Sequence, residues 1–207
     1  RMSPDAWLAE CQHEVGLRLK EGLVYGEDSE GITAFEPRRN VRTSAVGWAE
    51  CKWRICAFDP GGDDPSALIA LGVTPDEHHH VYGIHRTRGG IDDLAANEIM
   101  GRWEQELGGR FSRVVKDAAG GASSVMTLQR MGWPAFAADK NRDEIAYVQG
   151  LFRSGRLTID PSCYADVERE IYSYWWDDRV DRTRGTVTRW ATKTGSDHHA
   201  DVLDAIR

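Results

Sequence analysis

The stretch WRICAFDPGGDDPSALIALGV (53–73) holds two short apolar runs separated by a turn. WRICAFD (53–59) is stopped by PGGDDP, which is typical of a buried strand that ends in a turn. SALIALGV (66–73) and HHVYGIHR (79–86) predict two further strands, joined by the turn TPDEH. Because the connections are short, the three runs together predict an antiparallel meander.

Helices and strands alternate in the sequence that follows. The apolar spacing predicts helices over 92–108, 122–131, 142–154 and 163–175, and strands over 111–117, 134–139 and 156–160. Residues 178–193 alternate like a hairpin, and helical spacing also occurs over 4–20 and 197–207. Helices that return the chain to a strand beside the first predict an α/β fold, with a mixed sheet covered by helices on both faces.

Composition excludes several classes of protein. The 207 residues are 41% hydrophobic and 29% charged, which suits one generous domain and excludes wholesale disorder. No apolar run approaches the roughly 20 residues of a membrane span. The net charge of −7 counts against a protein held to nucleic acid by bulk positive charge, although acids grouped around metal ions remain compatible with DNA binding. Four cysteines without CxxC spacing indicate reduced thiols in an intracellular protein.

Two aspartates lie where predicted buried strands end. Asp59 closes RICAFD and Asp117 closes RVVKD. At a strand end, the sheet holds a side chain rigidly beside the crevice where ligands bind in α/β folds. Each aspartate taken alone is more simply a turn residue, because D-P-G-G and D-A-A-G-G are turn sequences.

A third set of acids lies near the end of the chain. Asp197, Asp201 and Asp204 have the spacing i, i+4 and i+7, so they share one face of the helix predicted over 197–207. This helix alone predicts a solvated acidic face, with Asp197 as its N-cap. Combined with the strand-end acids, it forms a set of hard oxygen ligands that suits Mg²⁺ or Mn²⁺. Two such ions about 4 Å apart can serve an in-line attack on a phosphodiester.

The segments that carry these acids resemble the nuclease domain of phage terminase large subunits, the motors that package DNA. The similar segments are CAFDPGGDDPSALIALG (56–72), VVKDAAGG (114–121), NRDEIAYVQGLFRSGRLTIDPSC…YWWDDR (141–179) and DHHADVLDAIR (197–207). The resemblance covers about residues 51–207 and implies an RNase H-like nuclease domain there, with residues 1–50 as the tail and linker of a preceding ATPase domain. Because the chain starts at Arg1 and stops at Arg207 inside a predicted helix, we expect a piece of a longer protein.

The resemblance implies a metal-dependent endonuclease that cuts concatemeric double-stranded DNA with two ions, Mg²⁺ or Mn²⁺. Carried over residue by residue, Asp59 matches the first-strand acid and Asp117 the acid of the fourth strand. Either Asp201 or Asp204 matches the third acid, and Asp201 ranks slightly ahead. The implied partners are the ATPase domain, a portal protein and a small terminase subunit, in the host cytoplasm. No GxxxxGK[ST] loop occurs, so we do not expect this chain to hydrolyse ATP by the phosphate-loop mechanism.

The predicted hairpin is basic, with a local net charge of +4 over residues 179–193. We expect four of its residues to contact DNA phosphates: Arg182, Arg184, Arg189 and Lys193. The alternative is a basic, solvated edge that blocks association between sheets.

Two other motifs favour structural interpretations. His78, His79 and His80 enter a strand, where consecutive residues point to alternate faces, and no cysteine ligands accompany them, so a zinc site is disfavoured. Trp175 and Trp176 are expected in the core at the end of a helix, and base stacking is the alternative.

Two rival functions stay open at this point. Another RNase H-like nuclease, such as a Holliday-junction resolvase, would prefer four-way junctions to plain duplex. A binding or structural module of the motor would cut nothing in isolation, because a separate ATPase domain can supply most of the DNA affinity.

Overall fold

A six-stranded mixed sheet forms the centre of the computed structural model, which describes residues 24–26, 32–61, 65–117, 122–138, 143–172, 174–181 and 186–193. The strands are β1 (Trp53–Asp59), β2 (Ser66–Val73), β3 (His79–Thr87), β4 (Arg113–Lys116), β5 (Ala135–Ala137) and β6 (Leu157–Ile159). Their order is β5-β4-β1-β2-β3-β6. β1, β2 and β3 are antiparallel, β4 runs parallel to β1, β5 to β4, and β6 to β3. The predicted meander and the mixed sheet are therefore confirmed.

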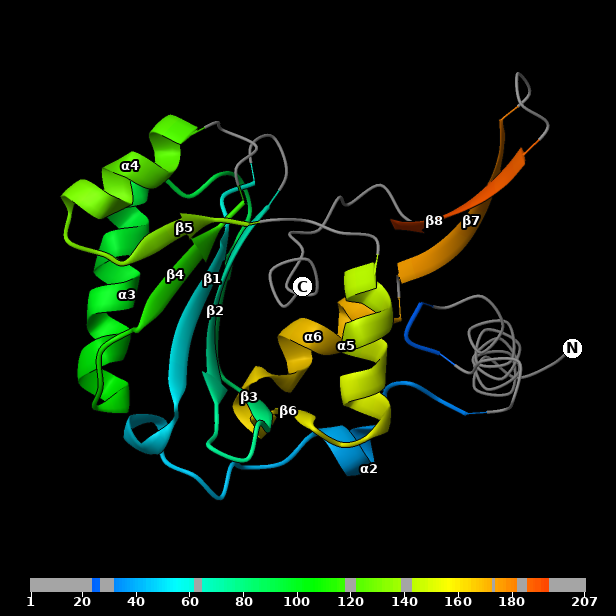
Figure 1. The fold of residues 1–207 in the computed structure, drawn as a ribbon, viewed down its shortest axis with the longest axis horizontal. Coiled ribbons are helices and arrows are strands. Elements are labelled where there is room, and N and C mark those ends of the chain that lie inside the picture. The colour runs from blue at the N-terminus through cyan, green and yellow to red at the C-terminus, as the bar shows by residue number, and fades with distance from the viewer. Residues whose placement is uncertain are drawn as a thin grey trace, which may run out of the picture.

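Helices cover both faces of this sheet (Figure 1). α3 (Asp93–Leu107) and α4 (Ala122–Arg130) pack on one face, and α5 (Asp143–Arg153) and α6 (Tyr164–Ile171) pack on the other. The Asp92 side chain caps α3 by accepting a bond from Ala95 N, and Gly108 ends the helix with φ +76°. Short helical turns complete the set: α2 (Pro37–Asn40), η1 (Trp48–Glu50) and η3 (Pro161–Cys163). The predicted α/β architecture is confirmed.

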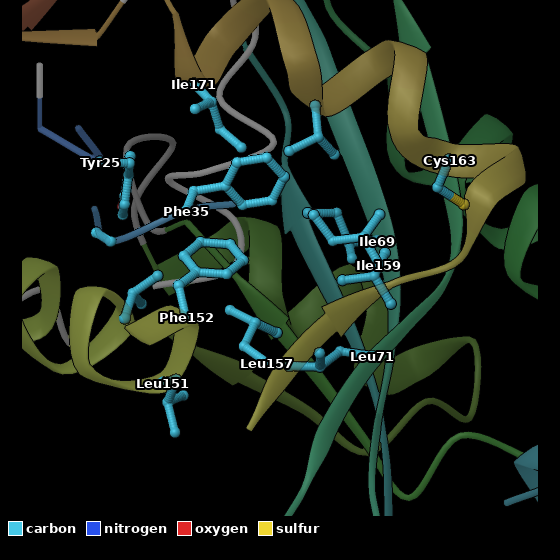
Figure 2. Close-up of a cluster of buried hydrophobic side chains, with 14 of the residues drawn as sticks. Tyr25, Phe35, Ile69, Leu71, Leu151, Phe152, Leu157, Ile159, Cys163 and Ile171 are labelled. Carbon is cyan, nitrogen blue, oxygen red and sulfur yellow. The ribbon is translucent and has the colours of Figure 1, made fainter. Parts of the chain in front are cut away.

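Side chains that alternate along the central strands feed two separate cores. Ala57, Ile69 and Val81 face the core shared with α5 and α6, part of which Figure 2 shows. Cys56 and Leu68, from the intervening positions, face the core shared with α3 and α4. Both faces of β2 are buried, which is why SALIALGV is an unbroken apolar run.

Residues 24–26 and 32–42 pack against α5 and β6, whereas Trp48 of η1 lies in the α3–α4 core. The rings of Tyr25 and Phe35 meet Phe152 edge-on, with centroids 5.7 and 5.2 Å away. The buried Asn40 amide donates to the carbonyl oxygens of Phe152 and Leu157, at 2.8 and 3.0 Å. This segment thus shares the α5–α6 core, and its assignment to the tail of an ATPase domain stays a prediction.

A separate two-stranded sheet follows α6. β7 (Tyr174–Asp181) and β8 (Thr186–Lys193) are antiparallel, which confirms the predicted hairpin but starts it earlier. The expected helix over 163–175 ends at Ile171, so the placement of Trp175 and Trp176 at a helix end is wrong. A run of tyrosine and tryptophan favours a strand, because aromatic residues fit a pleated surface.

Two predicted helices, over 4–20 and 197–207, lie outside the described residues. In the part of the chain that the structure describes, no helix combines the length and apolar character needed to cross a bilayer.

Candidate active site

Asp59 and Asp117 lie next to each other at the carboxyl ends of β1 and β4. The parallel register pairs Phe58 with Lys116, and Asp117 N donates to Phe58 O over 2.9 Å. One further step along each strand therefore sets the two aspartates side by side, about 4.8 Å apart between neighbouring backbones. Both side chains are half-buried. The structure thus brings together the two strand-end acids, while their catalytic role stays a proposal.

Both aspartates belong to the α5–α6 face of the sheet. Successive side chains on a strand point to opposite faces. Phe58 belongs to the core under α3 and α4, so Asp59 faces the other way. Val114 belongs to that same core, and Asp117, three residues later, also faces α5 and α6. The two carboxylates therefore share one face and one edge of the sheet.

A network of hydrogen bonds fixes the turn that follows Asp59. The Asp59 carboxylate accepts from Gly61 N at 3.1 Å, and Gly61 adopts φ +62°, which glycine tolerates best. The buried Ser66 hydroxyl donates to Pro60 O and accepts from Ile91 N at 2.7 Å. Ile91 N also reaches Pro60 O at 3.2 Å. The turn is thereby tied to both β2 and the loop before α3.

A buried lysine, Lys116, lies on the opposite face, next to Asp117 in sequence and paired with Phe58 in strand register. Lys116 is 3% exposed, forms an ion pair with Asp93 in the first turn of α3, and stands 4.9 Å from the centre of the Phe58 ring. This pair joins α3 to β4. The sequence analysis missed Lys116, although a lysine at a core-facing position of RVVKD is the signal that would have marked it.

A second buried ion pair lies on the same face as the acids. Asp59 pairs with Ala67 on β2, and Ala67 pairs with Arg86 on β3, so these residues form one row across the sheet with Asp117. Arg86 Nε lies 3.8 Å from Glu170 Oε1 of α6, and the two side chains are 17% and 5% exposed. The sequence analysis missed both, because strand register and the packing of α6 bring them together.

The remaining predicted site residues are placed only in part. Five of them lie outside the described residues: Asp197, Asp201, Asp204, Arg182 and Arg184. Arg189 and Lys193 lie on β8, opposite Asp178 and Tyr174 of β7. Among the described residues, no group of three or more His, Cys, Asp and Glu side chains is arranged to hold a metal ion.

The histidine run belongs to the sheet. His80 is fully buried, with Nδ1 2.7 Å from Thr158 Oγ1 and its ring 4.5 Å from that of Tyr82. Burial lowers the pKa of His80 to about 4, and it lowers the pKa of His79 as well. His80 Nε2 has no hydrogen-bond partner within the described ranges. His80 is therefore a neutral core histidine.

The described cysteines are buried free thiols. Cys51, Cys56 and Cys163 form no disulfide among the residues that the structure describes. Burial raises the pKa of the Cys56 and Cys163 thiols, which keeps them in the unreactive thiol form. The three described cysteines are free thiols, as the sequence predicted.

The fold matches solved structures of phage large terminases. The large terminase of one thermophilic bacteriophage has a TM-score of 0.68 and 19% identity, over 89% of this chain and 43% of that one. The nuclease domain of the P22 large terminase matches with a TM-score of 0.61 and 17% identity. The match covers 91% of this chain and 90% of the P22 domain. The large terminase nuclease of the thermophilic phage G20c matches with a TM-score of 0.59 and 13% identity. The match covers 89% of this chain and 95% of the G20c nuclease. The chain therefore has the RNase H-like fold of a large terminase nuclease.

Comparison at the level of sequence finds no relative, since no family model and no curated protein matches the chain. The chain spans less than half of the first of these large terminases but almost the whole of the P22 and G20c nuclease domains. The likeness thus lies with the nuclease portion of these motors.

Proposed function

We propose that the chain is a metal-dependent endonuclease domain of a phage large terminase, which cuts concatemeric double-stranded DNA during genome packaging. The observation that carries this proposal is the pairing of Asp59 and Asp117 on one face, at the ends of adjacent parallel strands. The fold shared with terminase nuclease domains supports it.

The donor set fits Mg²⁺ or Mn²⁺. Carboxylate oxygens are the ligands that these hard cations prefer. Two aspartates on adjacent strands repel each other when both are ionised, and a divalent cation between them offsets that repulsion. Asp59 and Asp117 would hold the ions, and we propose that Asp201 or Asp204 completes the set. A bound pair of such ions would supply water activation and charge stabilisation for phosphodiester hydrolysis.

The surrounding residues fix the positions of Asp59 and Asp117. The bond from Gly61 N orients the Asp59 carboxylate, and the bond to Phe58 O fixes the backbone of Asp117. The buried hydroxyl of Ser66 ties the turn after Asp59 to the loop before α3. Ligands held on rigid strand ends lose little freedom on binding an ion, which raises affinity and fixes the geometry of the reaction.

The basic hairpin is the proposed DNA-binding element. Arg189 and Lys193 are four residues apart on β8, so their backbones lie about 13 Å apart. With Arg182 and Arg184, they would supply positive charge for backbone phosphates. The further partners that we propose are an ATPase domain, a portal protein and a small terminase subunit, all in the host cytoplasm.

Plasmid cleavage tests the proposal. Wild-type protein, Asp59→Asn and Asp117→Asn are incubated with supercoiled DNA in Mn²⁺, Mg²⁺ or EDTA, and Glu98→Gln, an exposed carboxylate on α3, is the matched control. We expect metal-dependent cutting by wild type and Glu98→Gln, with a loss of about a hundredfold or more in the other two. Unchanged thermal unfolding shows that the loss is local.

Three other outcomes would contradict it. Cutting retained by either Asn variant removes that acid from the catalytic set, and no cutting by wild type in any metal favours a non-cutting module. Faster cleavage of four-way junctions than of plain duplex favours a resolvase.

A further inference from the structure

We propose that Arg86 contacts a backbone phosphate of the DNA beside Asp59, and that Glu170 positions Arg86 for this contact. This inference rests on the proposed nuclease function and adds a substrate-binding group to its site. Neither residue belongs to the acid set or to the basic hairpin.

The position of Arg86 follows from strand register. Asp117, Asp59, Ala67 and Arg86 form one row across four neighbouring strands. Ile84, two residues before Arg86, packs in the α5–α6 core, so Arg86 is on the face of the two aspartates. Two strand spacings, about 10 Å, separate the backbones of Asp59 and Arg86. Ala67 of β2 stands between them in the row and is itself fully buried.

The surroundings of the pair make a purely structural role a poor explanation. Glu170 lies on the inner face of α6 beside Val167 and Ile171, and both of these are fully buried. Two charges withdrawn from water carry a desolvation penalty, and an apolar pair of similar volume at such a site is often equally stable or more stable. An arginine held here by a glutamate is therefore better explained by an anion that it binds.

Within the Arg86–Glu170 pair, the arginine is the residue that a phosphate can reach from solvent. The approach is closest through Nε at 3.8 Å, so the guanidinium ends are not clamped in a short two-pronged contact with Glu170. The arginine side chain is 17% exposed and the glutamate 5%, so the cation lies on the solvent side. A planar guanidinium matches two phosphate oxygens at once, which a lysine cannot do.

The test measures DNA binding without cleavage. A fluorescent duplex is titrated with the full chain in Ca²⁺ at several salt concentrations, using wild type and Arg86→Met/Glu170→Leu. The double variant removes both charges of this ion pair together. The matched control is Lys116→Met/Asp93→Leu, which removes the buried pair on the other face.

We expect the Arg86→Met/Glu170→Leu protein to unfold at or above the wild-type temperature, and to bind DNA about tenfold more weakly. The slope of log K against log salt should fall by about 0.9, the value for one phosphate contact. The control should keep the wild-type slope. Wild-type affinity and slope in the folded double variant would overturn the proposal and make the pair structural.

A conservative variant decides the matter if the double variant does not fold. Arg86→Lys keeps the charge opposite Glu170 but loses the two-pronged geometry. We expect it to bind DNA about threefold more weakly, and wild-type affinity would overturn the inference. Failure of the nuclease proposal has a different signature, which is absence of cutting by wild type while the binding slopes still differ.

Discussion

Two ion pairs lie on opposite faces of one sheet. In one of them the anion is the more exposed partner, and in the other the cation is. In Lys116–Asp93, the lysine side chain is 4% exposed and the aspartate 17%. In Arg86–Glu170, the arginine is 17% exposed and the glutamate 5%. The first pair encloses its cation, in contact with the Phe58 ring, whereas the second leaves its cation on the solvent side.

The difference in exposure indicates that the ion pairs on the two faces have different roles. The enclosed lysine joins α3 to β4 through its ion pair with Asp93. The arginine lies in the same row as the proposed metal ligands, Asp59 and Asp117. A buried ion pair is therefore informative about function only when its position relative to the site is known.

The largest expected effect on stability comes from removing only one partner of the Lys116–Asp93 pair. Lys116→Met leaves the Asp93 carboxylate without its lysine, and we expect the free energy of unfolding to fall by about 3 kcal/mol. Lys116→Met/Asp93→Leu should recover most of that loss. Urea unfolding of both proteins measures the two values, and equal losses in the single and double variants would show that the charge pair is not the source.

Acid pH tests a buried polar group that is not part of an ion pair. Burial lowers the pKa of His80 from 6.5 to about 4, an effect that Asp160 opposes and Arg42 reinforces. The unfolded chain binds the proton more readily between these values, so stability is complete above pH 6.5 and falls as the pH drops. We expect His80 to account for about 2 kcal/mol of stability lost between pH 7.5 and 5.

His80→Gln isolates this contribution, because His79 and His85 titrate in both proteins. Urea unfolding at the two pH values should show a smaller loss in the variant. An equal loss would place the acid sensitivity elsewhere.

The smallest expected effect concerns the turn after Asp59. Ser66→Ala removes the hydroxyl that bonds to Pro60 O and Ile91 N, and we expect a loss of about 1–2 kcal/mol in unfolding free energy. If the turn positions Asp59, the variant should also bind Mn²⁺ several-fold more weakly. An unchanged Mn²⁺ affinity in the destabilised protein would restrict Ser66 to a structural role.

Local patterns predicted much of the fold. The strands over 53–59 and 66–73 appear at the expected bounds, since buried runs bounded by turn residues leave few alternatives. The position of Asp59 at a strand end followed from the turn sequence, whereas its pairing with Asp117 came from the parallel register of β1 and β4. α6 ended early because the aromatic run after Ile171 prefers a strand, and a helical period alone does not reveal such competition.

The Arg86–Glu170 pair was beyond sequence reasoning for a different reason. The two residues are 84 positions apart, and they meet only because β2 and β3 have a particular register and α6 packs across them. A one-residue slip in register would have moved Arg86 to the other face. Lys116 was missed because a single charge inside an apolar run looks like an exposed position until the alternation is fixed on both sides.

Mn²⁺ binding measured by calorimetry tests the central claim most directly. The central claim is the proposal that Asp59 and Asp117 together hold divalent ions at the carboxyl ends of β1 and β4. It predicts binding by wild type and by Glu98→Gln, and at least about a tenfold loss of affinity in Asp59→Asn and in Asp117→Asn. Wild-type affinity for Mn²⁺ in both Asn variants would contradict it.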